Sequence, residues 1–420
     1  MLDLQDRLAE LEELGLYRRM RMVSGPQGPR VVLDGKPVLL LCSNNYLGLA
    51  DHPRVREAAA DAAMRWGAGS GASRLVSGNM TLHRRLEERL AAFKGTQSAL
   101  LFGSGYLANL GVVPALARRG EIVFSDELNH ASIIDGCRLA GAETFVYRHA
   151  DMEHLTWGLR NADGRGALIV TDGVFSMDGD VAPLEDIVGL ARRHDLRVMV
   201  DDAHGTGTQG PGGRGAVVDA GLDGAVDVVV GTLGKALGAY GAYVACDHVM
   251  ARYLVNTARP LIFSTGLPPA AVAAAMAALE LIGEQPRRVE RLAENSDTLR
   301  DGLAREGFDV SGSETQIVPL IVGDAGLAMR ICESALEQGV FAQAIRPPTV
   351  PQGTSRLRLA VMASHTKAEL REAARVLAQA ALRHGLRPST TLPVAAAQSA
   401  AGGPARVFDG NAQERMPRAA

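Results

Sequence analysis

The chain has 420 residues, of which 47% are hydrophobic and 22% are charged, a composition typical of globular proteins. Because one hydrophobic core rarely organises so long a chain, we expect two or more domains. The formal net charge of -3 provides no strong positive field, so neither nucleic acid nor an anionic membrane is a predicted partner.

The first 22 residues mix acids and bases and lack the apolar core of a secretory signal. No run of about 18 apolar residues occurs, so no membrane-spanning helix is predicted. The cysteines lie far apart without a Cys-x-x-Cys pair, at Cys42, Cys137, Cys246 and Cys332. Neither a metal site nor a disulfide framework is therefore predicted, and reduced thiols suggest a cytoplasmic protein.

The N-terminal part begins with leucines at helical spacing, which predict an amphipathic helix over 3–14. Residues 30–41 are apolar on both sides of the turn signal Asp34-Gly35, so two short strands are expected there. Residues 83–95 have the pattern of a helix that ends at Gly95.

The middle of the chain alternates between short apolar runs and helical segments such as 184–195. The apolar runs, read as strands, are 98–102, 121–126, 167–173, 197–202 and 226–232. Several of them are apolar throughout, as in strands that are buried on both faces. This alternation predicts an α/β fold with a mainly parallel sheet covered by helices.

The C-terminal part changes pattern. Residues 290–385 read as helix, strand, helix, strand and helix, which indicates a smaller α+β domain. The tail is rich in Ala, Pro, Gly and Ser and is predicted to be disordered. The predicted division is an N-terminal helix and arm, a large domain, a C-terminal α+β domain and a tail, over 1–45, 46–285, 286–385 and 386–420.

A single lysine, Lys235, stands in the glycine-rich stretch VVVGTLGKALGAYGAY. It could belong to a phosphate-binding loop, lie in a solvated turn, or act as an amine nucleophile. The first reading fails on spacing, because Val229 stands where a Walker A motif has its first glycine and Ala236 where it has Ser or Thr.

A second glycine loop, Gly103-x-Gly105-x-x-Ala108, lies between a predicted strand and a predicted helix. The next strand ends at Asp126, about where a dinucleotide fold holds ribose, so an NAD-dependent dehydrogenase is an alternative. Backbone N–H groups at a helix N-terminus bind any phosphate group, however, so they do not show which ligand carries it.

Polar residues follow three of the predicted strands. Asp201 and His204 come after one, Thr232 and Lys235 after another, and His130 after a third. Ligand sites of open α/β sheets gather at such C-terminal strand ends. A lysine, an acid, imidazoles and a phosphate-binding loop suit pyridoxal 5′-phosphate (PLP), which needs a Schiff-base lysine and an acid beside its ring nitrogen.

With these residues in place, the chain resembles the α-oxoamine synthases, which are fold-type I PLP enzymes, from about residue 15 to 385. The motifs that carry the resemblance are SNNYLGL (43–49), GSGASRLVSG (69–78), SDELNHAS (125–132), GVFSMDGD (173–180), VDDAHGTG (200–207), GTLGKALG (231–238) and STGLPP (264–269). The family implies a large domain with a mainly parallel sheet and a smaller C-terminal domain. It also implies a homodimer with active sites at the interface.

The resemblance implies catalytic roles for four residues. Lys235 would carry PLP and then act as the proton-transfer base. Asp201 would pair with the ring nitrogen, although Asp202 is an alternative. His204 would hydrogen-bond the ring 3-oxygen, and His130 would stack on the ring.

Further contacts with the cofactor follow from the same resemblance. Gly105 and Tyr106 would bind the phosphate through backbone N–H groups, Thr232 would add a hydroxyl, and Ser176 would line the cofactor pocket. Ser264 and Thr265 would reach the phosphate in the partner chain.

The amino-acid carboxylate would be held by Asn44 and Arg358, because an arginine fork matches two carboxylate oxygens. Arg356 is expected to face the other way. Arg18 and Thr349 match positions that contact the acyl substrate, with the neighbours of Arg18 as alternatives.

The segments PLIVGD (319–324) and AIRPPTVPQGTSRLRL (344–359) resemble most the family member that condenses L-alanine with a pimeloyl thioester in biotin synthesis. The thioester could be of CoA or of a carrier protein. Family members that use another pair, such as glycine with acetyl-CoA, are the alternative, and a catalytically silent PLP-binding protein is another.

Overall fold

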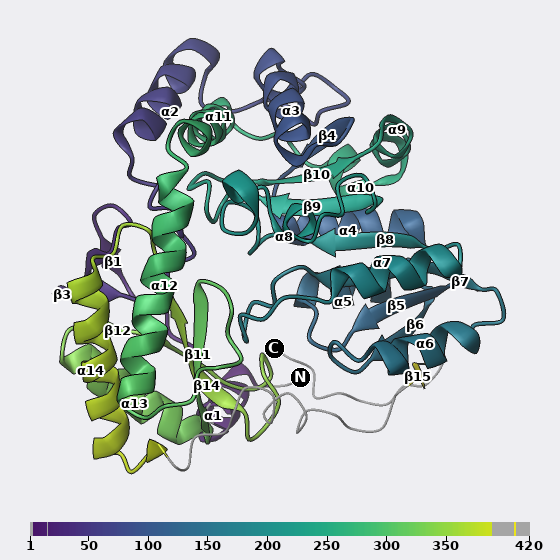
Figure 1. The fold of residues 1–420 in the computed structure, drawn as a ribbon. Helices are drawn as coiled ribbons and strands as arrows, with labels where there is room; N and C mark the ends of the chain where they lie inside the picture. Colours follow the sequence, from purple (N-terminus) through teal and green to yellow (C-terminus); the bar gives the residue numbers. More distant parts are fainter. Residues whose placement is uncertain (1–2, 15, 389–406, 409–420) are drawn as a thin grey trace.

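The computed structural model describes residues 3–14, 16–388 and 407–408. In this part the chain forms an eight-stranded, a four-stranded and a three-stranded sheet, with helices packed around them (Figure 1). The predicted α/β class with a mainly parallel sheet is confirmed.

The eight-stranded sheet has the order β15-β6-β5-β7-β8-β9-β10-β4. Neighbours from β6 to β9 run parallel, whereas β10 is antiparallel to both β9 and β4. The strands are β4 Ser98–Phe102, β5 Ile122–Asp126, β6 Glu143–Tyr147, β7 Gly166–Asp172, β8 Arg197–Asp201, β9 Val228–Thr232, β10 Ala242–Cys246 and β15 Val407–Phe408.

Both faces of this sheet are buried. Val228 and Val230 of β9 belong to one hydrophobic cluster, and Val229 between them belongs to another. Successive side chains of a strand point to opposite faces, so a strand between two helix layers needs apolar residues throughout. This is the physical reason for the continuous apolar runs in the sequence.

The helices divide between the two faces according to the cluster in which they bury their side chains. One layer contains α4 Gly105–Leu116, α5 Ala131–Ala140, α9 His248–Thr257 and α10 Arg259–Phe263. The other contains α2 Pro53–Trp66, α3 Thr81–Lys94, α6 Met152–Arg160, α7 Leu184–Arg193, α8 Ala216–Asp219 and α11 Pro269–Glu284, and a short 3₁₀ turn spans Pro211–Gly213.

The C-terminal part builds the three-stranded antiparallel sheet, in the order β11-β14-β13. Its elements are α12 Arg287–Arg305, β11 Ile317–Gly323, α13 Ala325–Glu337, β13 Gln343–Ile345, β14 Ser355–Ala360 and α14 Lys367–Arg383. Figure 1 shows α12, α13 and α14 beside this sheet, away from the eight-stranded one.

The N-terminal segment joins this C-terminal part. Its elements are α1 Leu4–Glu13, β1 Val23–Ser24, β2 Arg30–Leu33 and β3 Lys36–Leu40, and β12 Val340–Phe341 completes their sheet. β3 pairs in parallel with β12, so residues about 300 positions apart in sequence share one sheet. The predicted division of the chain into domains stays a prediction.

The predicted helices and strands named above are confirmed, and Gly95 ends α3 in the left-handed conformation. The strands β1, β6, β10, β12 and β13 were not predicted. Most of the predicted tail 386–420 lies outside the described residues, but within it Val407–Phe408 pairs antiparallel with Thr144 and Phe145 of β6.

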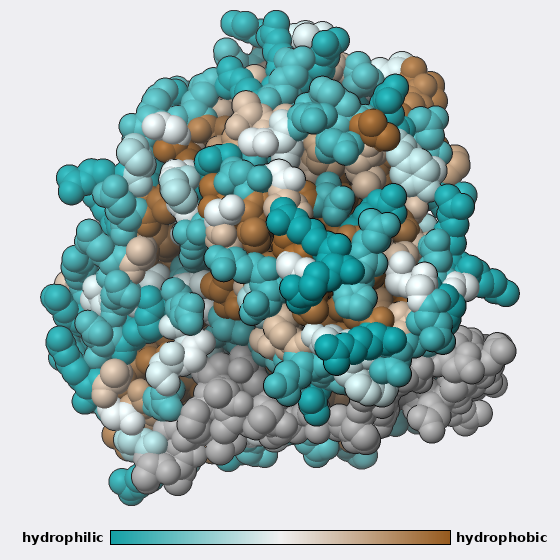
Figure 2. All heavy atoms as spheres, turned by 45° about the vertical axis from the view of Figure 1, so that its right-hand side comes forward, coloured by the Kyte–Doolittle hydropathy of each residue, from teal (hydrophilic) through white to brown (hydrophobic). Residues whose placement is uncertain are grey.

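None of the helices in the described ranges combines the length and apolar character needed to cross a bilayer. Figure 2 shows a face that is mostly hydrophilic, with apolar residues visible between the polar ones near its middle.

Candidate active site

The C-terminal ends of the parallel strands bring the predicted residues together. Asp201 ends β8, Lys235 lies three residues after β9, and His130 lies four residues after β5. Asp172, at the end of β7, is the register partner of Asp201. All of these strands run in the same direction, so their polar ends share one edge of the sheet.

Lys235 stands at the start of a chain of hydrogen bonds. Its Nζ lies 2.8 Å from Nε2 of His204, and Nδ1 of His204 lies 2.6 Å from the hydroxyl oxygen of Tyr46. Tyr46 donates to Oδ1 of Asn44 at 3.0 Å. Its oxygen therefore accepts from Nδ1–H of His204, which leaves Nε2 as the acceptor for Lys235.

Burial lowers the pKa of Lys235 to about 8, because Arg358 adds to the cost of the charge and the Asp201 carboxylate offsets only part of it. Burial also lowers the pKa of His204 well below its usual value, with help from Lys235 and Arg358. Most of the amine is therefore still protonated at physiological pH, but a far larger share is neutral than in an ordinary lysine, and its imidazole neighbour is neutral.

Arg358 closes the other end of this chain. Its Nη1 and Nη2 donate to Oδ1 of Asn44 at 3.3 and 3.2 Å, and Nη2 also lies 3.3 Å from the Tyr46 hydroxyl. Its Nε donates to the backbone carbonyl of Ser176. Asn44 and Arg358, predicted to act together, thus lie in contact.

The Asp201 carboxylate is held in place on the side of the sheet that faces α4. Nδ2 of Asn109 donates to its Oδ2 at 2.6 Å, and the Ala203 N–H donates to its Oδ1 at 3.0 Å. The same Asn109 amide group donates to Oγ of Ser132 at 2.8 Å, and this hydroxyl lies 2.7 Å from Nδ1 of His130. One network therefore joins Asp201 to His130.

Asp202, the alternative to Asp201, points the other way. Nζ of Lys94, in α3, donates to its Oδ2 at 2.6 Å, and both side chains are fully buried. The Ala216 N–H donates to its Oδ1 at 3.0 Å. Adjacent residues at a strand end face opposite sides, and this carboxylate already has its partners.

His130 is positioned through its backbone as well as its ring. Its N–H donates to Oδ2 of Asp172 at 3.0 Å. Burial raises the pKa of Asp172 well above its usual value, and the neighbouring Asp201 adds to that rise. Burial lowers the pKa of His130, so its ring is neutral at physiological pH and presents an uncharged plane.

The glycine loop leads into the first turn of α4. Ser104 caps this helix by accepting from the Leu107 N–H, and no acceptor in the described ranges takes the N–H groups of Gly105 and Tyr106. No atom lies within 4 Å of the position that a Gly105 Cβ would occupy. The two amides therefore have no acceptor among the described residues, the space beside Gly105 is open, and an anion can bind there.

The other predicted cofactor residues are less closely grouped. Oγ1 of Thr232 accepts from the Gly234 N–H at 3.1 Å, within the loop of Lys235, and Ser176 is buried. Ser264 and Thr265 line a small cavity with Gly103. Thr265 also forms a β-bridge with Ser73, and within the described residues no hydrogen bond joins Ser264 or Thr265 to Lys235.

The expectation that Arg356 faces away from Arg358 is wrong. Arg356 pairs with Asp178, and Arg358 donates to the carbonyl of Ser176 in the same loop. The side-chain period of a strand is two residues, so positions 356 and 358 of β14 share a face.

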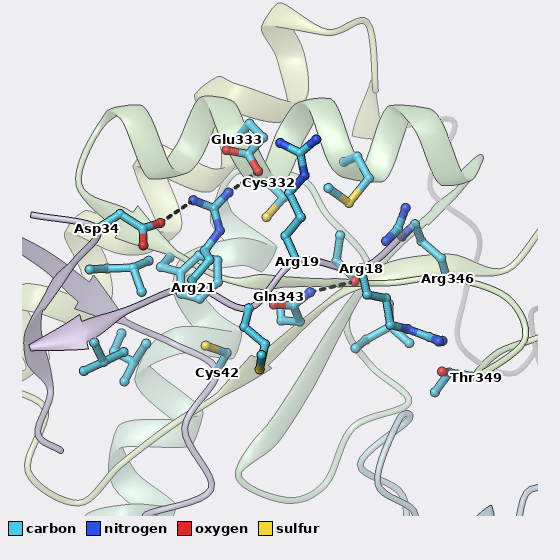
Figure 3. Close-up of a pocket in the computed structure, with 18 of the residues that line it drawn as sticks. Arg18, Arg19, Arg21, Asp34, Cys42, Cys332, Glu333, Gln343, Arg346 and Thr349 are labelled. Carbon is cyan, nitrogen blue, oxygen red and sulfur yellow. Dashed lines mark hydrogen bonds and ion pairs between the residues drawn. The ribbon is translucent and has the colours of Figure 1, made fainter. Parts of the chain in front are cut away.

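A cavity of about 1000 Å³ lies between the N-terminal segment and α13, and Ser43 at its wall is the neighbour of Asn44. Arg18 and Thr349 both line it, and Figure 3 shows Arg18 pointing toward Thr349. Arg21 points the other way and pairs with Asp34 and Glu333. The placement thus favours Arg18 over Arg21 as the arginine facing a ligand in this cavity.

The dinucleotide reading of the second glycine loop is contradicted by the topology. In a Rossmann βαβ unit, the strands before and after the phosphate-binding helix are close neighbours in the sheet. Here four strands separate β4 from β5. The Asp126 carboxylate also accepts from the Leu128 and Ala150 N–H groups and contacts His149, so it is not free for a ribose.

Two residues of the site were missed in the sequence. Tyr46 lies within the quoted motif SNNYLGL, which marked the segment but gave no sign of its contact with His204, 158 residues away. Asn109 stands one turn into α4, a position that gives no sign of its contact with Asp201, 92 residues away.

The sequence of this chain is similar to those of known proteins. The profile of the family described as aminotransferase class I and II matches residues 36–377. A protein named 8-amino-7-oxononanoate synthase, from Citrifermentans bemidjiense, is 55% identical over 386 residues, covering 91% of this chain and 98% of the relative.

Solved structures agree on the fold. Serine palmitoyltransferase from S. paucimobilis, with a bound PLP-myriocin aldimine, has a TM-score of 0.87 and 34% identity, covering 91% of this chain and 98% of its own. The 8-amino-7-oxononanoate synthase from Francisella tularensis has a TM-score of 0.71 and 26% identity, covering 81% and 97%.

Proposed function

Because this chain belongs to the class I and II aminotransferase family and, within it, to the α-oxoamine synthases, we propose that it condenses L-alanine with a pimeloyl thioester. The products are 8-amino-7-oxononanoate, CO2 and a free thiol, and the reaction belongs to biotin synthesis. The contact between Lys235 and the neutral His204, at an edge that also holds Asp201, is the observation that carries the proposal, and Arg358 reaches the same network from β14 through Tyr46.

The cofactor is PLP, and the residues present fit it. The open N–H groups of Gly105 and Tyr106 suit its phosphate, the Asp201 carboxylate suits its ring nitrogen, and the Lys235 amine suits its carbonyl. His130 offers a neutral plane for its ring. When bound to an amino acid, PLP withdraws electrons from Cα, so that a proton can leave there.

Lys235 moves that proton. Its pKa of about 8 keeps a useful share of the amine neutral, and Nζ of Lys235 takes the proton from Cα of alanine. Nε2 of His204 accepts a hydrogen bond from the amine and holds its orientation. Tyr46 fixes the other side of that imidazole.

Arg358 and Asn44 bind the carboxylate of alanine. The Arg358 guanidinium is held by the Ser176 carbonyl and by Asn44, so its fork is oriented before the substrate arrives. A fixed carboxylate places the Cα proton reproducibly before Lys235.

The cavity beside Asn44 favours a longer acyl group with a terminal acid over an acetyl group. Apolar side chains such as Val23 and Phe341 line it together with Arg18, and its volume of about 1000 Å³ far exceeds what two carbons fill. An aliphatic chain that ends in a carboxylate would match both the apolar side chains and the arginine. The acetyl group of the alternative pair, glycine with acetyl-CoA, has neither a long apolar chain nor a terminal acid.

A panel of thioesters tests the substrate assignment. Pimeloyl-CoA, a pimeloyl carrier protein, acetyl-CoA and palmitoyl-CoA are each offered with alanine, glycine or serine, and thiol release and product mass are recorded. We expect alanine with a pimeloyl thioester to give the highest kcat/KM and a product of the mass of 8-amino-7-oxononanoate. Faster release with glycine and acetyl-CoA would contradict the proposal.

Two arginine variants sharpen that panel. Arg18→Met should raise KM for the pimeloyl thioester about tenfold or more and leave KM for alanine unchanged, because it removes a charge-assisted contact. Arg19→Met is the matched control, since Arg19 points toward α13 in Figure 3 rather than toward Thr349. Equal effects of both variants would argue against a specific contact with Arg18.

The protein is proposed to act as a homodimer in the cytoplasm. Large apolar side chains are exposed around the Ser73–Thr265 bridge and in the lysine loop, at Leu75, Val76, Tyr240 and Phe263. If a second copy covers these side chains, Ser264 and Thr265 of one copy would lie near the phosphate site of the other copy. The four cysteines are free thiols, as a reducing compartment keeps them.

A further inference from the structure

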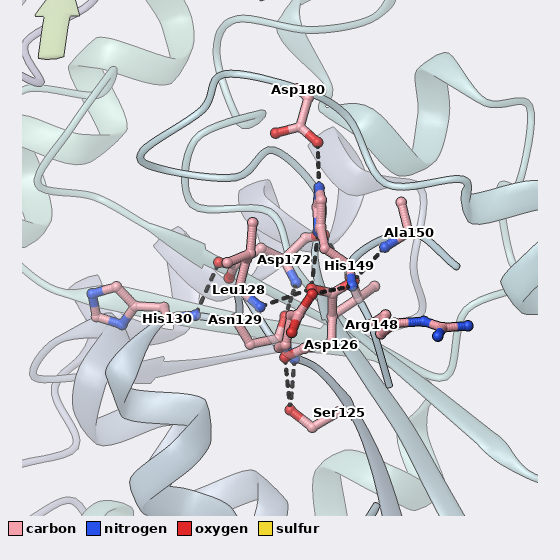
Figure 4. A network of polar contacts seen from close by, with 12 residues as sticks. Ser125, Asp126, Leu128, Asn129, His130, Arg148, His149, Ala150, Asp172 and Asp180 are labelled. Atoms are coloured by element: carbon pink, nitrogen blue, oxygen red, sulfur yellow. Dashed lines mark hydrogen bonds and ion pairs between the residues drawn. The ribbon is translucent and has the colours of Figure 1, made fainter. Parts of the chain in front are cut away.

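His149 occupies an unusual place just beyond β6, between two carboxylates (Figure 4). Its Nδ1 lies 3.0 Å from Oδ1 of Asp126, and its Nε2 lies 2.7 Å from Oδ2 of Asp180. Its ring stands edge-on to Phe175 at a centroid distance of 4.4 Å. The side chain of His149 is 5% exposed and that of Asp126 is 2% exposed.

The contacts define the charge of this ring. Carboxylate oxygens only accept hydrogen bonds, and Asp126 already accepts from the Leu128 and Ala150 N–H groups. Both ring nitrogens of His149 must therefore donate, which makes the ring an imidazolium. Burial would lower the pKa of His149, but Asp126 and Asp180 raise it to about 10.

The first carboxylate organises the segment that carries His130. Asp126 ends β5, and its Oδ1 accepts from the Leu128 N–H at 2.9 Å, which starts the turn toward His130. Asn129 in this turn donates to the Val170 carbonyl and accepts from the Asp172 N–H. We call residues 126–130 the His130 loop.

The second carboxylate belongs to the loop after β7, residues 173–183, which we call the Ser176 loop. Three alternate residues anchor it. The Ser176 carbonyl accepts from Arg358, Asp178 pairs with Arg356, and Asp180 contacts His149. The first two anchors come from β14, whereas His149 follows β6 of the eight-stranded sheet. The Gly173 N–H, at the start of the loop, also donates to the Asp201 carbonyl of β8, so His149 is the side-chain contact that holds the far part of the loop to this part of the structure.

We propose that His149 is a positioning residue that ties the His130 loop to the Ser176 loop and so sets the two sides of the PLP site. It touches neither cofactor nor substrate and acts through Asp126 and Asp180. The proposal rests on the proposed function only in naming PLP as the ligand of that site.

Loss of the imidazolium would do more than remove two hydrogen bonds. Oδ1 of Asp180 is buried and has no hydrogen-bond partner in the described residues, so His149 is what compensates this carboxylate. Without the cation, Asp126 and Asp180 would face each other as uncompensated charges. Their repulsion would push the two loops apart at the point where His149 now joins them.

The test compares His149→Gln with His154→Gln. Glutamine is uncharged, and it offers one amide nitrogen in place of the two ring nitrogens that now reach the two carboxylates, so the charged bridge is lost. His154 is a matched control because it is also a buried histidine, five residues along, whose Nδ1 accepts only from the Arg148 N–H and whose ring packs on Phe145.

Three kinds of measurement are made on each variant: amide hydrogen exchange of 126–130 and 173–183 in the PLP-free protein, the Kd for PLP, and kcat and KM for alanine. In His149→Gln we expect faster exchange in both loops, PLP binding weakened about 10- to 100-fold, and kcat lowered by a similar factor. In His154→Gln we expect only a lower thermal midpoint, with all three quantities near those of the unaltered protein.

Unchanged exchange in both loops together with an unchanged Kd for PLP in His149→Gln would overturn the proposal. If that variant does not fold, Asp180→Asn, which removes one partner at a more exposed position, is measured in its place and is expected to loosen the Ser176 loop alone. The loop exchange of the PLP-free protein needs no substrate, so failure of the proposed reaction would leave this readout intact.

Discussion

Two buried lysines lie on opposite sides of the same strand ends, and their surroundings differ. Lys94 pairs with Asp202 at 2.6 Å and also donates to the Arg214 carbonyl. Burial would lower the pKa of Lys94, but the Asp202 carboxylate outweighs burial and raises it. Among the described residues the Lys235 amine forms a hydrogen bond only with the neutral His204, and the pKa of Lys235 falls to about 8.

The comparison shows that burial alone does not make a lysine reactive. Both amines are removed from water, and the presence of a contacting carboxylate decides which of them stays charged. Lys94 therefore fixes the backbone that carries Asp201 and His204, whereas Lys235 is free to exchange a proton. The chain holds only four lysines, Lys36, Lys94, Lys235 and Lys367, so each can be followed separately.

The largest expected effect is on turnover. Lys235→Ala should lower kcat by about 10⁴-fold or more, because it removes both the attachment point of PLP and the base. Borohydride should then no longer couple the cofactor to the chain, as followed by the mass of the intact protein. A Lys235→Ala protein with turnover within tenfold of the original would refute the assignment.

The next effect is on stability. Lys94→Met should lower the free energy of unfolding by about 3–5 kcal/mol, because it leaves Asp202 buried without its cation. Urea unfolding of the PLP-free protein measures the loss, with Lys36→Met at an exposed position as the control, expected within about 0.5 kcal/mol of no change. Borohydride coupling at Lys235 should survive in both variants, and its loss in Lys94→Met alone would mean that the two lysines do not have separate roles.

The smallest effect concerns pH. In the PLP-free protein, modification of Lys235 by an amine reagent should increase about tenfold above pH 7 and level off beyond its pKa of about 8, since only the neutral amine reacts. Lys94, with its raised pKa and buried ion pair, should not level off in that range. Mass spectrometry of the modified peptides separates the two, and a plateau for Lys235 only above pH 10 would show that burial does not lower its pKa.

Local patterns predicted most elements of this fold. Continuous apolar runs indicated strands with two buried faces, and Gly95 was correctly read as the end of a helix. Pairing between distant segments could not be read, because periodicity carries no information about partners. The parallel pairing of β3 with β12 and the antiparallel direction of β10 are examples.

In the site, too, contacts between distant residues could not be predicted from the sequence. The residue types needed for PLP were visible at the strand ends, but the choice between Asp201 and Asp202 needed the position of Lys94, more than 100 residues away. The error over Arg356 had a different origin, since the two-residue period of a strand was available in the sequence and was misapplied. The bridge of His149 between two loops had no local sign at all.

The antiparallel strand β10 has a consequence for the size of the ligand. It lies between β9 and β4, so the loop with Lys235 and the loop with Gly105 leave the same edge of the sheet two strand spacings apart. Each spacing is about 4.8 Å, which places the reactive amine and the anion-binding amides on the order of 10 Å from each other. By separating β9 from β4, β10 sets this distance to about the length of one aromatic ring with a phosphate arm.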